Sequence, residues 1–100
     1  MIKHIVMWRL KERALDNDRE TNAHQLKERL EALRGKVPGM LSLEVGLDLS
    51  GDPDAAHVVL YSEFEDQDAL ERYQRHPDHE AVKPFVKEIR SERRVVDYAI

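Results

Sequence analysis

Apolar and polar positions alternate along the first ten residues of the chain. His4, Val6 and Trp8 fall on one face of this pattern, and Ile5 and Met7 fall on the other. Period-two spacing of β-branched and aromatic residues predicts a strand. Because both faces carry apolar side chains, we expect this strand to be covered on both sides.

Helical spacing replaces alternation in the next segment. Asn17, followed three residues later by Glu20, resembles a capping box and predicts a helix start, and Gly35 predicts the helix end. Apolar residues recur along the segment every three or four positions with charged residues between them, which predicts one amphipathic helix. These residues are Ala23, Leu26, Leu30, Leu33 and Val37.

Alternation returns in two further strands. Residues 41–48 place Leu, Leu, Val and Leu on one face, which predicts a strand with a single apolar side. Residues 50–54 are rich in turn formers and predict a loop. The alternating run from residue 57 to residue 64 predicts the third strand, and residues 94–100 predict the last one.

A proline divides the second helical region. Asp66 can cap a helix that ends near His76, because Pro77 lacks a backbone N–H and pushes the preceding residue out of helical angles. A second helix should start at Pro77, where proline is well tolerated. Pro84, inside that second helix, predicts a kink or an early break.

The two sides of this joint carry candidate functional groups. Tyr73 lies on the apolar face of the first helix, and His79 lies on the apolar stripe of the second. His76 sits at the break itself, where we expect it to cap the second helix or to point to solvent. The joint can therefore direct Tyr73 and His79 toward a shared space.

The predicted order is strand, helix, strand, strand, helix, strand. This order predicts an α+β, ferredoxin-like βαββαβ fold in one domain of residues 1–100, with both helices on one face of an antiparallel sheet. The other face would be bare in a monomer, and we expect it to carry Ile5, Met7, Val58, Leu60 and Phe64. Small domains rarely expose so large an apolar patch, so we predict a homodimer through the sheet.

Composition narrows the classes of function. The 100 residues carry a net charge of −4 with acids and bases interleaved, which argues against a nucleic-acid-binding module. No apolar run is long enough to span a membrane, and the N-terminal alternation is unlike a signal peptide, so we expect a cytoplasmic protein. The absence of cysteine excludes disulfides, a thiol nucleophile and a thiolate zinc site.

Four motifs together resemble the stress-responsive A/B barrel (Dabb) family: the opening segment 1–6, Val37-Pro38-Gly39, Tyr73-x-x-His76-Pro77-x-His79 and the closing segment 94–98. The resemblance runs along nearly the whole chain and implies a dimeric α+β barrel in which two ferredoxin-like subunits join their sheets. A plant member of the family closes a linear polyketide by an aldol reaction without a cofactor.

By motif position, the resemblance implies that His4, Tyr73 and His79 carry such chemistry here. His79 near neutrality suits a general base, and the Tyr73 hydroxyl suits a neutral donor to an enolate, with His4 orienting substrate or base. Lys27 stands where the plant enzyme has an aromatic residue, which argues against an extended apolar polyketide. We expect the ligand, a small carbonyl or aromatic compound, to be bound by Val6, Trp8, Leu26, Leu30, His57 and Val82.

Other readings of the same residues stay open. Tyr73 and His79 can simply pack in the core, which leaves a small-molecule-binding or protein-interaction homodimer without catalysis. A cofactor-free or haem-degrading monooxygenase is a further alternative, in which Trp8 gains importance. A metal site drawn from His76, His79 and Glu80 is disfavoured because the proline joint provides no HExxH helix, and no cofactor is expected.

Overall fold

The computed structural model describes all 100 residues, and its main elements follow the predicted order. A short hairpin of β2 and β3 precedes the first helix. The elements are β1 (Ile2–Leu10), β2 (Arg13–Ala14), β3 (Asn17–Asp18), α1 (Arg19–Glu31), β4 (Met40–Leu47), β5 (Val58–Phe64), α2 (Gln67–Arg75), α3 (Pro77–Ile89) and β6 (Arg90–Ala99).

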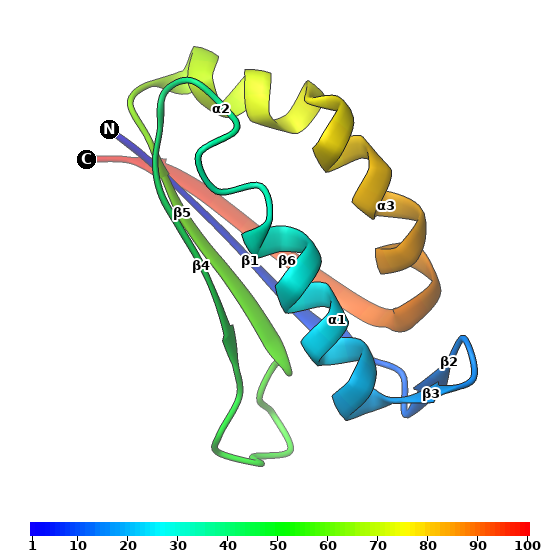
Figure 1. Ribbon diagram of the computed structural model, residues 1–100. Helices are drawn as coiled ribbons and strands as arrows, with labels where there is room; N and C mark the ends of the chain where they lie inside the picture. Colours follow the sequence, from blue (N-terminus) through cyan, green and yellow to red (C-terminus); the bar gives the residue numbers. More distant parts are fainter.

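A four-stranded antiparallel sheet forms one layer of the molecule, and the three helices form the other. The strand order is β4-β5-β1-β6, so the first strand lies in the middle of the sheet. All three helices cover the same face, with the α2–α3 joint arching over one end (Figure 1). This is the predicted ferredoxin-like α+β arrangement. None of the helices has the length and apolar composition needed to cross a membrane.

The hydrophobic core lies between the sheet and the helices. Val6, Trp8 and Leu10 project from β1 into it, opposite Leu26 and Leu30 of α1. Full burial of one such aliphatic side chain stabilises the fold by about 1.5–3 kcal/mol. The alternation predicted for the first strand is therefore confirmed on its helix-covered face.

The predicted composition of the open sheet face was partly wrong. Val58, Leu60 and Phe64 are at most 2% exposed and belong to the core. The ladder explains this: Leu60 lies directly opposite Val6, and directly opposed residues share a face of the sheet. The open face instead carries the alternate set, namely Ile5, Met7, Val59, Tyr61, Val96 and Tyr98.

The first helix is shorter than predicted at both ends. Its N-cap is Asp18, whose carboxylate accepts a hydrogen bond from the Thr21 N–H at 2.8 Å, whereas Asn17 belongs to β3. The helix ends at Glu31 rather than at Gly35, because the chain continues in three-residue turns such as Arg34 N–H to the Glu31 carbonyl. The apolar residues after Glu31 keep nearly helical spacing in these tighter turns, so the sequence pattern does not show where the helix ends.

Local irregularities account for the other differences. A register shift between Met40 and Ser42 leaves Leu41 unpaired and 53% exposed, so the single apolar face predicted for β4 does not include it. The helix α3 runs through Pro84, which is exposed, so the early break was wrong. The last strand begins at Arg90, four residues earlier than predicted.

Candidate functional site

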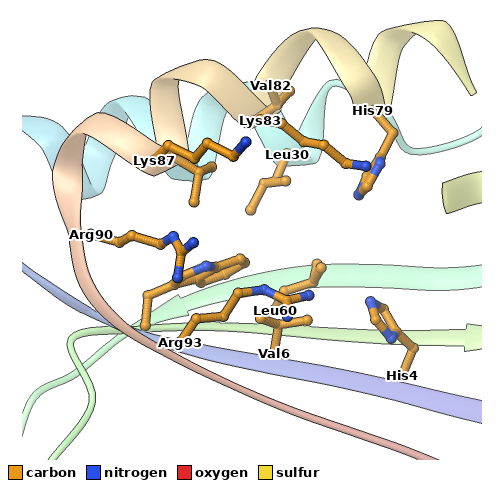
Figure 2. Close-up of a pocket in the computed structure, with 12 residues that line it drawn as sticks. His4, Val6, Leu30, Leu60, His79, Val82, Lys83, Lys87, Arg90 and Arg93 are labelled. Carbon is orange, nitrogen blue, oxygen red and sulfur yellow. The ribbon is translucent and has the colours of Figure 1, made fainter. Parts of the chain in front are cut away.

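A cavity of about 330 Å³ lies between α3 and the sheet. Such a volume is at the lower end of the range for small-molecule sites. Half of its lining is apolar and comes from β1, β5, α1 and α3: Val6, Trp8, Leu30, Leu60, Val82 and Val86. Figure 2 shows sheet residues below the cavity and α3 residues above it.

Two imidazoles face each other across this cavity. His4 rises from β1, and His79 descends from the first turns of α3 (Figure 2). The proline joint explains the position of His79, since α2 ends at Arg75, His76 is extended and α3 starts at Pro77, as predicted. The structure thus places two of the three residues predicted to be catalytic on the cavity wall.

His4 is held by a carboxylate from the edge strand. Its Nδ1 forms a hydrogen bond with Oδ1 of Asp97, which lies directly opposite it on β6. His4 is only 3% exposed, so this contact fixes the ring and makes Nε2 the nitrogen available to a ligand. Asp97 could not be assigned this role from the sequence alone, because its place beside His4 depends on the pairing of the first and last strands.

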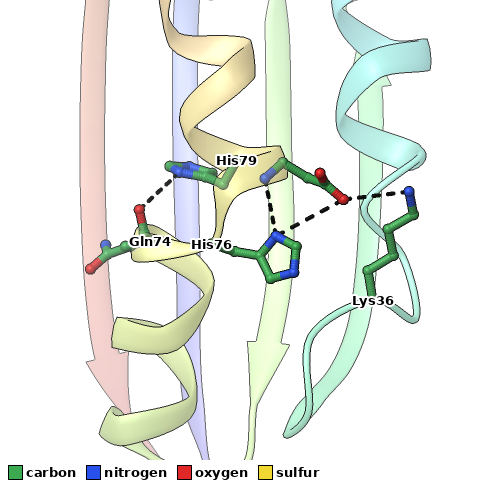
Figure 3. Close-up of polar contacts among 5 residues, drawn as sticks. Lys36, Gln74, His76 and His79 are labelled. Carbon is green, nitrogen blue, oxygen red and sulfur yellow. Dashed lines mark hydrogen bonds and ion pairs between the residues drawn. The ribbon is translucent and has the colours of Figure 1, made fainter.

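His79 is oriented by the end of α2. Its Nδ1 donates a hydrogen bond to the Gln74 carbonyl at 3.2 Å, which leaves Nε2 as the acceptor (Figure 3). Burial lowers the pKa of His79, and the charge of Lys83 lowers it further. The ring is therefore neutral at pH 7, the state in which an imidazole can take a proton.

Tyr73 lies behind the two imidazoles rather than on the cavity wall. It is fully buried, and its ring centroid is 4.6 Å from that of His79 and 6.1 Å from that of His4. Its hydroxyl has no hydrogen-bond partner, and burial raises the pKa of Tyr73, so the phenol stays neutral. A buried hydroxyl without a partner costs about 1–3 kcal/mol.

Leu26 and His57 do not line this cavity. Leu26 is fully buried in the core. His57 precedes β5 at the far end of the sheet, where its Nδ1 accepts a hydrogen bond from the Leu10 N–H at 2.9 Å. Burial, together with the charges of Arg19 and Arg9, lowers the pKa of His57 and suits that acceptor role.

His76 caps α3 instead of entering the cavity. Its Nδ1 accepts a hydrogen bond from the Asp78 N–H at 3.1 Å, and Asp78 in turn lies 3.5 Å from the Lys36 ammonium (Figure 3). No group of three or more His, Asp or Glu side chains is arranged to hold a metal ion. The hydrogen bond from the Asp78 N–H to His76 confirms the expectation that His76 caps the second helix.

Four basic residues complete the cavity wall, and the sequence reasoning missed all of them: Lys83, Lys87, Arg90 and Arg93. No acidic residue lines the cavity. The four side chains are hard to distinguish in the sequence because charged residues are frequent along α3 and β6. The spacing of Lys83 and Lys87, one helical turn apart, was the one available sign.

Comparison with solved structures supports the fold. A dimeric ferredoxin-like protein of unknown function from Bacteroides fragilis is 33% identical, with a TM-score of 0.81 over 99% of this chain and 95% of that one. A Dabb family protein from Mesorhizobium loti is 30% identical, with a TM-score of 0.70 over 99% and 95% of the two chains. A hydroxynitrile lyase from Passiflora edulis is 21% identical, with a TM-score of 0.77 over 99% and 92%.

A search of curated proteins gives no match. The family model of the stress-responsive A/B barrel domain, however, matches residues 2–100. The match includes both imidazoles of the cavity and the proline joint that positions one of them. The chain therefore belongs to the stress-responsive A/B barrel (Dabb) family.

Proposed function

We propose that this protein binds a small carbonyl compound in the cavity between α3 and the sheet, and that it catalyses acid–base chemistry there without a cofactor. The observation that carries the proposal is the pair of oriented imidazoles, His4 and His79, facing each other across a partly apolar cavity. Each ring has one nitrogen occupied by a protein acceptor and the other available.

The proposed reaction begins with enolisation. His79, neutral at pH 7, takes a proton through Nε2 from the carbon next to the ligand carbonyl. The C–H electron pair moves into the new C=C bond, and the carbonyl oxygen becomes an enolate oxygen. His4, with its ring fixed by Asp97 through Nδ1, would donate a hydrogen bond to that oxygen from Nε2 in its imidazolium form. The enolate carbon then attacks a second carbonyl, as in an aldol ring closure, and the alkoxide formed from that carbonyl takes the proton back from His79.

Tyr73 supports this chemistry by packing behind the imidazoles. Its hydroxyl has no partner among the protein groups, and its ring packs against His79. The donor role expected for its hydroxyl from the sequence is not part of the proposal, because the hydroxyl is buried outside the cavity wall. The hydroxynitrile lyase with the same fold is consistent with a lyase or aldol reaction on this scaffold.

Hydrogen–deuterium exchange tests the proposal without knowledge of the natural substrate. We expect the protein in D₂O to accelerate exchange of the methyl protons of 2-acetonaphthone, observed by ¹H NMR. His79→Asn should abolish the acceleration, whereas the matched control His76→Asn should retain it, because His76 only caps α3. Equal exchange in both variants, or no acceleration with any methyl ketone of this size, would contradict the catalytic role.

A non-catalytic homodimer that binds small molecules is the second candidate function. The observation in its favour is that Tyr73 lies outside the cavity wall, packed as a core residue. Thermal stabilisation by 2-acetonaphthone without protein-dependent exchange would select this alternative.

A further inference from the structure

The charge of the cavity wall is opposite to that of the whole protein. Acidic residues outnumber Lys and Arg by 20 to 16 in the sequence, yet the cavity is lined by four basic residues and by no acidic one. Figure 2 shows the cationic ends of Lys87, Arg90 and Arg93 directed toward the cavity, with Lys87 reaching in from α3 above and Arg93 from the sheet below. The imidazole of His4 lies toward the other end in the same view.

The protein itself neutralises only one of these cations. Lys83 forms an ion pair with Glu80 at 2.8 Å. Lys87, Arg90 and Arg93 have no carboxylate within 4 Å, although the neighbouring Arg94 pairs with Glu92 at 2.9 Å on the same strand. Lys87 and Arg93 are exposed, so water screens their mutual repulsion, and an anion at this end of the cavity would be attracted by all three cations.

Helix electrostatics explain only part of the cluster. Lys87 lies in the last turn of α3, where the partial negative charge of the helix end attracts cations. Arg93 belongs to β6 and lies opposite Trp8, so this effect does not account for it. Trp8 also lines the cavity, and its indole Nε1 is a buried donor without a partner.

We propose that the ligand is an organic carboxylate, whose anionic group binds to Arg90, Arg93 and Lys87 while its carbonyl end lies between His4 and His79. Arginine forks match a carboxylate in bidentate geometry. The arginine side chains, and not the helix end, would hold this group, because the C-terminal end of α3 carries partial negative charge. The assignment of the carbonyl end rests on the proposed function.

A matched pair of probes tests the inference. The ketone 6-acetyl-2-naphthoate carries the carboxylate at the end opposite its acetyl group, and 6-acetyl-2-naphthamide is its neutral counterpart of the same shape. Their dissociation constants are measured by calorimetry at pH 7.5. We expect the wild type to bind the carboxylate at least about tenfold more tightly than the amide, as a charge-assisted contact provides.

Three variants locate the effect. The preference for the carboxylate over the amide should fall in the single variant Arg93→Gln. In the double variant Arg90→Gln/Arg93→Gln, it should fall to about twofold or less. Arg94→Gln, the same change on the next residue of β6, should keep the preference, because Arg94 lies on the other face of the sheet. Arg93 is exposed, so its replacement leaves the core intact; circular dichroism verifies this.

The outcomes separate this inference from the proposed function. Equal affinity for the two probes, an unchanged preference in the double variant, or no binding of either probe at millimolar concentration would overturn the carboxylate site. Methyl exchange measured on the same samples reports on the imidazoles alone. Exchange without carboxylate preference leaves the proposed function standing, and carboxylate preference without exchange leaves the site standing.

Discussion

At the scale of residues, the cavity combines groups that the sequence revealed to different degrees. Tyr73 and His79 stand out because polar side chains on apolar helix faces are unusual, and His4 stands out in the same way on its strand. No such pattern distinguishes Asp97, Arg90 and Arg93 in the sequence, because their positions near the cavity follow only from the pairing of β6 with β1. Contacts between distant strands are therefore what the sequence could not supply.

The lowered pKa of His79 leads to a prediction about how methyl exchange and stability depend on pH. Burial lowers its pKa below 6.5 in the folded state, so the unfolded chain binds its proton first as pH falls. We expect methyl exchange to be constant above pH 6.5 and to decline below it, as His79 becomes protonated. The contribution of this histidine to stability should also decline as pH falls from 6.5 toward its folded-state pKa.

Titration of the His79 ring by NMR measures that pKa directly, and His79→Asn should remove the corresponding part of the stability profile. A His79 pKa above 6.5 would contradict the buried, neutral base. His76→Asn serves again as the control, since that ring caps α3 without entering the cavity.

Removal of the Tyr73 hydroxyl provides a second prediction at this scale. Tyr73→Phe removes a buried group without a partner, so the free energy of unfolding should stay the same or rise by about 1 kcal/mol. Methyl exchange should be unchanged in the same variant, because the buried hydroxyl does not line the cavity. Urea denaturation gives the first quantity, and a clear loss of stability would show that the hydroxyl has a partner in solution.

At the scale of elements, alternation and helical spacing identified every major helix and strand, but not all of their ends. The proline joint was located to the residue because Pro77 restricts both itself and His76. The end of α1 was missed because the turn after Glu31 keeps the apolar spacing. The bulge at Leu41 likewise leaves no mark on the alternating pattern.

Gly39 offers a test of packing between the turn before β4 and α2. Its φ is +87°, and a Cβ there would lie 2.6 Å from the Cβ of Ala69, whereas Gly51 has a φ of +65° with open space around it. Both substitutions by alanine force a strained backbone that costs about 1 kcal/mol. Gly39→Ala should lose more stability than Gly51→Ala because α2 must also move.

Urea denaturation of the two glycine variants provides the comparison. Similar losses in both would mean that the backbone conformation alone matters and that the turn is not closely packed on α2. A larger loss in Gly39→Ala is the expected result.

At the scale of the whole molecule, the sheet has one face covered by helices and one face open. The open face carries Ile5, Met7, Val59, Val96 and Tyr98. Three of these residues, Met7, Val96 and Tyr98, are at least 40% exposed. The similar protein from Bacteroides fragilis is described as dimeric. We propose that two copies of this chain pack their open faces together.

Met7→Lys tests the dimer because it places a charge in the middle of the open face. Sedimentation velocity should show a dimer for the wild type and a monomer for this variant. Leu49→Lys is the matched control, since Leu49 is 99% exposed in a loop away from the sheet. A monomeric wild type, or a dimer in both variants, would contradict an interface built on this face.

The central claim is that the cavity between α3 and the sheet holds a carbonyl ligand between His4 and His79. A crystal structure of the protein with 6-acetyl-2-naphthoate tests it most directly. We predict electron density for the ligand in this cavity, with the acetyl oxygen within hydrogen-bond distance of an imidazole and the carboxylate against Arg90 and Arg93. A ligand bound elsewhere, with the cavity unchanged, would contradict the claim.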